Sequence, residues 1–182
     1  MTSSSLGTLQ ELGDDRYQLT FTRTLAHPRP KVWAAITENA HLAHWFPGVI
    51  RGERVAGARL EFVESGGEDG ETSFEGEMLV FEPPSLIELL WGTDTIRIEL
   101  VEEGADGTTV LTLTDTFTEL GKAARDGAGW HDCLDQLAHH LDGTTAPLGS
   151  ATRWKSLDAR YVAALGPAAA TIGVPDDYEF ED

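Results

Sequence analysis

The stretch FTRTLAHPRPKVWAAITENAHLAHWFPG, residues 21–48, decides the fold of this chain. Apolar and polar residues alternate up to Leu25, which is the period-2 pattern of a half-buried strand. Pro28 and Pro30 end this strand, and Pro30 fits the first turn of a helix, where its missing N–H is not needed. Apolar residues then gather on one face of two short helical segments. The sequence therefore predicts a strand, two short helices and a Trp-Phe-Pro-Gly corner.

Runs of alternating apolar and polar residues continue downstream of this corner, with turn signals between them. They cover residues 49–55, 59–63, 72–82, 87–91, 96–100 and 111–117. Together with the first strand they make about seven strands, and the short turns between neighbours predict an antiparallel meander.

The period changes after residue 117. Apolar residues at helical spacing form one stripe, and the stripe ends at Gly143, where a glycine suits the C-terminus of a helix. The residues of this stripe are Trp130, Leu134, Leu137, Ala138 and Leu141. The sequence therefore predicts one long amphipathic helix after the sheet.

A second helical stripe follows over residues 151–166. It consists of Trp154, Leu157, Tyr161 and Leu165. Such a stripe must be buried. Two alternatives satisfy this need: the helix packs on its own domain, or it forms a homodimer through these four residues. The remaining residues, 167–182, are expected to be an acidic tail.

Charge and composition exclude several classes of function. The formal net charge is −18, from 31 acidic and 13 basic residues, which argues against binding nucleic acid or an anionic membrane surface. Cys133 is the only cysteine, so no intrachain disulfide forms and a reducing compartment is expected. We find neither a signal-peptide pattern nor an apolar run of membrane-spanning length, and expect a soluble cytoplasmic protein.

Several short motifs, taken in order, resemble a known family. They are Arg23, PRPKVWAAIT at 28–37, Leu42 with WFPG at 45–48, Gly57, the Pro83-Pro84 break before Ile87, Leu89 and Trp91, and Gly129-Trp130 with Leu134, Leu137 and Leu141. This combination resembles the START-like helix-grip (SRPBCC) superfamily. Within it, the chain is similar to the family named for the activator of the heat-shock-protein-90 ATPase. The resemblance covers residues 16–143, most of the chain.

The resemblance implies an α+β helix-grip fold. In this fold a curved antiparallel sheet of about six to seven strands wraps a long C-terminal helix, and two short helices follow the first strand. The expected organisation is an N-terminal segment at 1–15, the helix-grip domain at 16–143, a linker at 144–150, an amphipathic helix at 151–166 and the acidic tail. The superfamily includes lipid carriers, cyclases and co-chaperone domains, so fold alone does not name the function.

The fold implies an apolar cavity between the sheet and the long helix, and ligand sites of this kind are mostly apolar with a few placed polar groups. Ordinary core packing is the alternative for the same side chains. The expected ligand-binding residues are Trp45, Phe46, Phe62, Phe74, Met78, Leu89, Trp91, Ile98, Trp130 and Leu134, with the charged pair Arg23 and Asp115.

Arg23 and Asp115 occupy inward positions of the first and last strands, which are neighbours in a helix-grip sheet. A buried unpaired charge is unfavourable, so we expect the two side chains to form a salt bridge. In the functional alternative, Arg23 anchors the polar head of a ligand. Glu75 and Glu77 alternate with apolar residues and are expected to face solvent.

Metal and cofactor signatures are missing. His41 and His44 are three residues apart, but no third ligand completes a zinc pattern, and the adjacent His139 and His140 point to different helix faces. Surface histidines are therefore expected, with no metal and no cofactor. Nothing in the sequence indicates activation of Cys133 as a nucleophile.

Three functions follow as hypotheses. The first is non-catalytic binding of an apolar or amphipathic small molecule, lipid-like or polyketide-like, in an internal cavity. The second is a co-chaperone-like protein with a chaperone as its partner. The third is a polyketide cyclase or aromatase-like enzyme, which needs a polar side chain projecting into the cavity.

Overall fold

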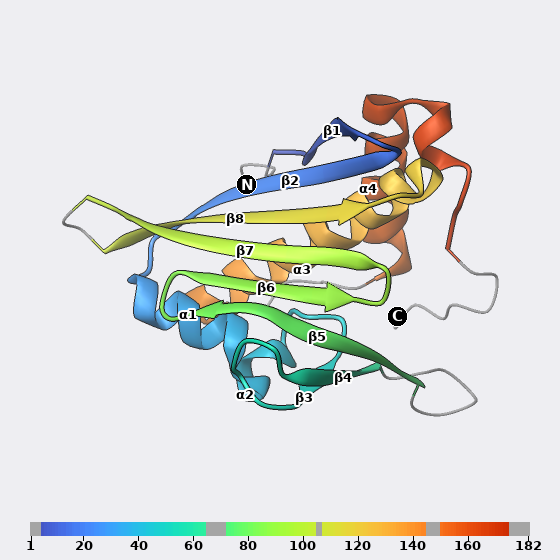
Figure 1. Ribbon diagram of the computed structural model, residues 1–182. Helices are drawn as coiled ribbons and strands as arrows, with labels where there is room; N and C mark the ends of the chain where they lie inside the picture. The colour runs from blue at the N-terminus through green and yellow to red at the C-terminus, as the bar shows by residue number, and fades with distance from the viewer. Residues whose placement is uncertain (1–4, 65–71, 105–106, 145–149, 175–182) are drawn as a thin grey trace.

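The computed structural model describes residues 5–64, 72–104, 107–144 and 150–174 (Figure 1). Within these residues, eight antiparallel strands form one curved, open sheet in the order β1-β2-β8-β7-β6-β5-β4-β3. The strands are β1 (Thr8–Gly13), β2 (Arg16–Leu25), β3 (Val49–Arg51), β4 (Arg59–Glu64), β5 (Thr72–Glu82), β6 (Leu86–Trp91), β7 (Asp94–Glu103) and β8 (Thr108–Phe117). The helices are α1 (Arg29–Thr37), α2 (Asn39–Leu42), η1 (Leu120–Lys122), α3 (Ala123–Asp142), α4 (Ala151–Leu165) and η2 (Pro167–Ala170).

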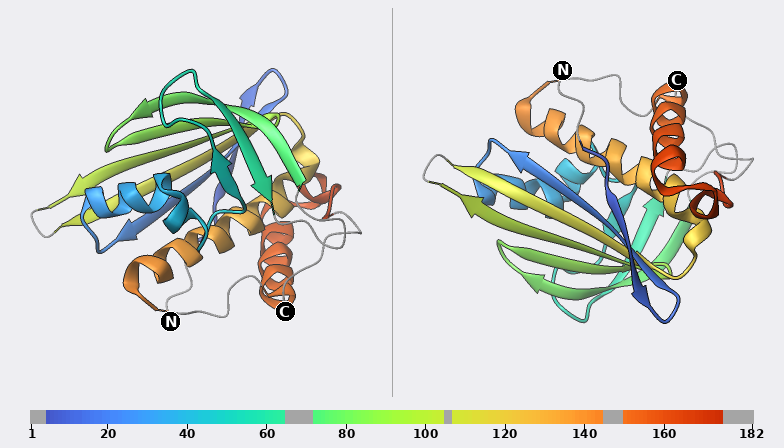
Figure 2. Two further views of the ribbon diagram at one scale, coloured as in Figure 1. Left: turned by 90° about the horizontal axis from the view of Figure 1, so that it is seen from below. Right: turned by 90° about the horizontal axis from the view of Figure 1, so that it is seen from above.

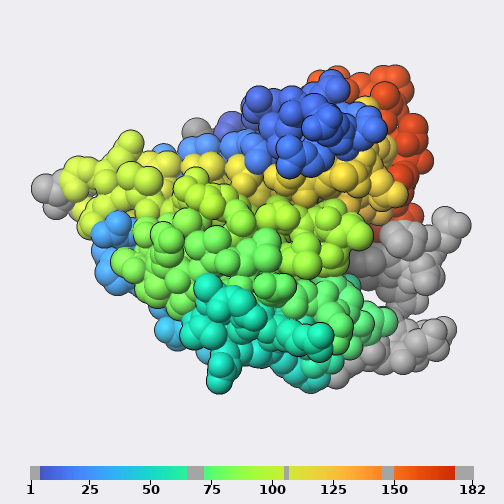
Figure 3. Space-filling model, in the orientation of Figure 1, coloured from blue at the N-terminus to red at the C-terminus, as the bar shows by residue number. Residues whose placement is uncertain are grey.

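The helices cover one face of the sheet. Figure 2 shows the sheet curving round α3, with α1 and α2 on the same side and α4 packed against α3 away from the sheet. The outer face of the sheet, from β1 and β2 to β3 and β4, is seen in Figure 3. This arrangement confirms the expected α+β helix-grip fold. No helix among the described residues is long and apolar enough to cross a membrane.

The sheet begins earlier than expected. β1 lies within residues 1–15, which the sequence pattern set apart as an N-terminal segment, and it pairs antiparallel with β2. All its side chains except that of Leu9 are exposed, so it lacks the apolar alternation that predicts a strand. The turn into β2 uses positive φ at Gly13, Asp14 and Asp15, residue types that tolerate this conformation.

The third strand is shorter than expected. The predicted run over residues 49–55 ends at Arg51, where β3 stops. Gly52 has φ of 126°, a conformation that breaks the strand. The following loop returns to the sheet because the N–H of Gly57 donates to the Met78 carbonyl at 2.7 Å.

α3 is the long amphipathic helix that the sequence predicts. Its apolar stripe is buried against the sheet, with Trp130, Leu134, Leu137 and Leu141 each no more than 7% exposed. Gly143 caps the helix in the left-handed conformation at φ 65°, as expected from a terminal glycine.

α4 packs on its own chain, in agreement with the first of the two alternatives for its stripe. Leu157 and Tyr161 are buried against α3, so these two side chains are already used within one subunit. Gly127 makes the close approach of α3 and α4 feasible, because a Cβ there would lie 2.7 Å from the Tyr161 ring. The homodimer stays a prediction.

Part of the expected tail is ordered structure. Residues 167–170 form η2, and Ala169 is buried. The N–H of Ile172 donates to the Gly121 carbonyl at 3.0 Å, which holds this segment beside η1. Linker residues 145–149 and tail residues 175–182 lie outside the described part of the chain.

Candidate functional site

An aromatic cluster fills the space between the sheet and α3. Trp91, at the end of β6, lies at its centre, with ring centroids 4.5 Å from Phe62, 4.8 Å from Phe74 and 5.0 Å from Phe46. Trp130 on α3 joins it, 6.3 Å from Trp91 and 6.0 Å from Phe46. Tilted and edge-on contacts of this kind are favourable between aromatic rings.

The structure places all ten expected apolar residues in or against one core. Phe62, Met78 and Leu134 are fully buried, whereas Phe74 and Trp91 are only half-buried and form the rim. At the Trp45-Phe46 corner, the indole N–H of Trp45 donates to the Ala35 carbonyl at 2.9 Å, so its polar edge is satisfied. The described side chains thus occupy the concave face by contacting one another.

Asp115 forms the polar end of this cluster. The Trp130 indole N–H donates to Asp115 Oδ2 at 3.1 Å, while the buried Oδ1 atom has no hydrogen-bond partner among the described residues. Burial raises the pKa of Asp115 to about 8, and the nearby carboxylates of Asp94 and Asp126 add to this increase. Asp115 is therefore largely protonated at neutral pH and can donate one hydrogen bond.

Lys122 pairs with the two carboxylates beside Asp115. Its ammonium lies 2.6 and 2.5 Å from the two oxygens of Asp94 and 3.7 Å from Asp126, all close to the start of α3. Oxygens of Asp94, Asp115 and Asp126 lie within 4.8 Å of one another, as metal ligands do. Because the Lys122 ammonium already lies between these carboxylates, we assign no metal to the group.

The predicted salt bridge between Arg23 and Asp115 is wrong. β2 and β8 are antiparallel neighbours as expected, but their register pairs Arg23 with Leu111 and Leu19 with Asp115. The two charged residues are therefore offset by four positions along the strands, about 13 Å at the rise of a β-strand. Arg23 Nε instead faces Asp135 on α3, at 3.8 Å.

Arg23 belongs to a second buried polar network, away from the aromatic cluster. Next to Asp135, the His131 ring is hydrogen-bonded to the Tyr161 hydroxyl at 3.0 Å, and that hydroxyl accepts from the Gly7 N–H at 2.7 Å. Burial lowers the pKa of His131 to about 4, so the ring is neutral. These contacts join β2, α3, α4 and the N-terminal segment, which indicates a structural role.

The sequence gives no signal for most of these polar contacts. His131, Lys122 and Asp94 are not among the candidate residues predicted from the sequence. Their hydrogen-bond partners Asp94 and Tyr161 lie 28 and 30 residues away, so local spacing does not reveal these bonds. The clearest signal is Asp115, an acidic residue at an apolar position of β8.

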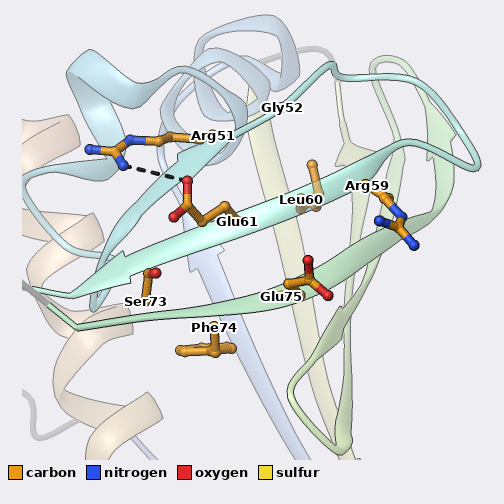
Figure 4. Close-up of a pocket in the computed structure, with 8 residues that line it drawn as sticks. All are labelled: Arg51, Gly52, Arg59, Leu60, Glu61, Ser73, Phe74 and Glu75. Atoms are coloured by element: carbon orange, nitrogen blue, oxygen red, sulfur yellow. Dashed lines mark hydrogen bonds and ion pairs between the residues drawn. The ribbon is translucent and has the colours of Figure 1, made fainter.

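A surface hollow of about 490 Å³ lies elsewhere, at the edge formed by β3, β4 and β5 (Figure 4). Its lining includes Arg51, Arg59, Glu61 and Glu75, and Arg51 contacts Glu61 at 3.4 Å. Figure 4 shows Glu75 pointing to one side of β5 and Phe74 to the other. The hollow is therefore mostly charged, and it meets the aromatic cluster only at Phe74, which belongs to both.

Two further expectations concern the glutamates of β5 and the reactivity of Cys133. Glu75 and Glu77 are both exposed, as predicted from their alternation with apolar residues. Burial raises the pKa of Cys133 to about 12, so its thiolate is scarce at neutral pH and the side chain is a poor nucleophile.

The curved sheet, the long helix in its grip and the apolar cluster between them define a helix-grip domain of the START-like class. Residues 26–142 match the family described as Activator of Hsp90 ATPase homolog 1-like protein. The chain belongs to this family. A search among curated proteins gives no match.

Solved bacterial structures share the fold. A conserved protein of unknown function, EF2215 from Enterococcus faecalis, aligns with a TM-score of 0.71 at 20% identity, over 87% of this chain and 90% of that one. CalU16 from Micromonospora echinospora aligns with a TM-score of 0.66 at 21% identity, over 86% and 95%. The BPP1335 protein of Bordetella parapertussis gives 0.66 at 24% identity, over 88% and 94%. At these identities the likeness concerns the fold alone.

Proposed function

We propose that this protein binds an uncharged amphipathic small molecule between the sheet and α3, without transforming it. The apolar part of the ligand inserts between the rings of Phe46, Trp91 and Trp130, entering at the half-buried rim formed by Phe74 and Trp91. Its polar atom reaches Asp115. The proposal rests on the family's helix-grip fold and on the polar end of the aromatic cluster.

The unpartnered Oδ1 atom of Asp115 is the observation that carries this proposal. A buried polar atom without a hydrogen bond is unfavourable, and such atoms are rare enough in native proteins to require an explanation. Asp115 lies directly beside Trp130, so an apolar ligand that inserts among the rings brings its own polar atom to this oxygen.

The charge around Asp115 selects the ligand. Asp94 and Asp126 lie close by and repel an anionic head group. The protonated Asp115 carboxyl donates a hydrogen bond, which suits a hydroxyl or carbonyl oxygen. Arg23, which would anchor the polar head of a ligand in the functional alternative, faces Asp135 at 3.8 Å. An alcohol or ketone of lipid-like or polyketide-like character is therefore favoured over a fatty acid.

Native mass spectrometry of the purified protein, followed by solvent extraction, tests the proposal directly. A stoichiometric apolar adduct is expected, and its mass identifies the ligand. The uncharged probe N-phenyl-1-naphthylamine should bind more tightly than an anionic naphthalene sulfonate.

Two tryptophan variants locate the site. Trp91→Leu should weaken binding of the uncharged probe by at least about fivefold, the loss of roughly one aromatic contact. Trp33→Leu is the matched control, because Trp33 is also half-buried but packs on Phe81 with centroids 5.4 Å apart, outside the cluster. Equal losses in both variants, or an adduct-free protein that binds neither probe, would contradict the proposal.

Two alternatives stay open, each with its own readout. The family description supports a co-chaperone-like role, in which the protein accelerates ATP hydrolysis by Hsp90. A cyclase-like role would use Asp115 as a proton donor to a polyketide carbonyl. In that case the bound compound would leave with an altered structure, whereas a carrier releases it unchanged.

A further inference from the structure

Two histidines near α2 meet a third, from the end of α3, at the surface. His41 lies in α2, His44 follows that helix, and His140 lies in the last turn of α3. His41 Nδ1 is 2.9 Å from His140 Nε2, and the rings of His44 and His140 stack with centroids 4.3 Å apart and planes at 12°. From sequence spacing alone, only His41 and His44 were related, and His140 supplies the third ring.

We propose that His41, His44 and His140 form a binding site for a divalent transition metal such as Zn²⁺, joining α2 to α3. Imidazole nitrogens are preferred ligands of Zn²⁺, Cu²⁺ and Ni²⁺. Three protein ligands with an open fourth position make a tetrahedral zinc site of the kind that also holds a water molecule.

The pair of His41 and His140 is nearly in place for this role. Two nitrogens bound to one tetrahedral zinc ion at about 2.05 Å lie roughly 3.3 Å apart. The observed separation of 2.9 Å requires the rings to part by only a few tenths of an ångström. His44 is exposed, so its ring can turn from stacking on His140 to coordinate the ion.

An outer carboxylate supports the ligand role of His41. If Nδ1 of His41 binds the metal, Nε2 carries the proton and points toward a carboxylate, as in many zinc sites. Glu38 Oε2 lies 4.0 Å from this nitrogen, close enough to accept its hydrogen bond after a small adjustment. The carboxylate fixes the tautomer that leaves Nδ1 free for the ion.

Nearby charges set how tightly the site can hold a cation. The Lys31 ammonium donates to the Leu141 carbonyl at 2.8 Å, next to His140 in the chain, and repels a dication. We therefore expect micromolar rather than nanomolar affinity. The strongly negative chain attracts cations to its surface.

Zinc titration of tag-free, chelator-treated protein tests the site, with isothermal calorimetry at neutral pH as the readout. One Zn²⁺ per chain is expected. Co²⁺ should give the visible absorption bands of a tetrahedral ion with nitrogen ligands, a signature that non-specific carboxylate binding does not produce.

Single substitutions separate this site from general cation binding. His140→Ala and His41→Ala should each weaken Zn²⁺ binding by at least about tenfold, and Glu38→Gln by somewhat less. His139→Ala is the matched control: it adjoins His140 on the same helix but bonds to Thr144 Oγ1 at 2.7 Å. Far-UV circular dichroism verifies that each variant is folded. No zinc binding, or an equal loss in His139→Ala, would overturn the proposal.

Discussion

Asp115 shows how a single residue can make the stability of this protein depend on pH. Its carboxyl is 1% exposed and lies among other acids, so the folded protein holds its proton more tightly than the unfolded chain does. The folded-state pKa of about 8 lies above the ordinary value of 3.8. The more tightly held proton of Asp115 therefore stabilises the folded protein fully below about pH 4, and this stabilisation is lost as the pH rises through 8.

Replacing this carboxyl with an amide should remove that dependence. In Asp115→Asn the side chain stays neutral and can still accept from Trp130, so the variant should gain stability over the wild type as the pH rises. We expect a gain on the order of 2 kcal/mol at pH 9, shrinking toward pH 5, in urea unfolding. Glu75→Gln, at an exposed site of β5, is the control. A gain that is the same at every pH would contradict this explanation.

The candidate site was only partly predictable from its residues. The period-2 and helical patterns predicted the burial of its apolar residues, because burial follows from spacing within each element. The pairing of Arg23 with Asp115 was wrong: the antiparallel arrangement of β2 and β8 was expected, but their register depends on turn lengths and packing along the whole sheet. Likewise, His140 meets His41 only because α3 ends beside α2.

At the scale of elements, β5 passes the aromatic cluster at a point where no side chain fits. A Cβ at Gly76 would overlap both the Leu90 carbonyl oxygen and the Phe62 ring. Gly76 therefore allows β6 and the aromatic rings to approach this strand closely.

Gly76→Ala should consequently destabilise the fold by at least about 2 kcal/mol and disturb the aromatic cluster, as seen in near-UV circular dichroism. Gly129→Ala is its counterpart on α3, where an added Cβ meets no atom within 4 Å. There alanine should stabilise the helix by about 0.8 kcal/mol, because it favours helical backbone over glycine. Thermal unfolding measures both, and a neutral Gly76→Ala would refute the close approach.

A hydroxyl group on α4 links this helix to α3 and to the N-terminal segment. Tyr161 accepts from the Gly7 N–H at 2.7 Å and bonds to His131, so Tyr161→Phe leaves a buried donor without its partner. We expect a loss of about 1–2 kcal/mol in urea unfolding. Tyr17→Phe serves for comparison, since Tyr17 stacks on Phe117 at a partly exposed position. If both variants lose the same amount, the hydroxyl of Tyr161 has no special role.

At the scale of the whole molecule, the net charge of −18 opposes the compact state. Like charges on a folded surface repel one another, and salt screens this repulsion. Raising NaCl from about 0.02 to 0.5 M should therefore increase the melting temperature by roughly 4 °C, equivalent to 1–2 kcal/mol for a domain of this size. A melting temperature that is insensitive to salt would indicate that the surface acids are well separated.

The fold as a whole was predictable where the chain alternates or repeats regularly. The strand, two helices, meander and long helix appear in the expected order, since each buries a face that the sequence marks as apolar. β1 escaped prediction because it adds to the sheet mainly through backbone pairing, with almost no buried side chains. The use of α4 within one subunit could not be chosen over a dimer because both bury the same stripe.

The tight grouping of indole and phenyl rings has an optical consequence. Trp91 and Trp130 lie 6.3 Å apart at a fixed inclination of 68°, close enough for their electronic transitions to couple. Such coupling produces paired bands of opposite sign in circular dichroism, whose strength depends on the distance and angle between the rings. A ligand that separates the two rings would alter these bands, so circular dichroism can follow binding without an added label.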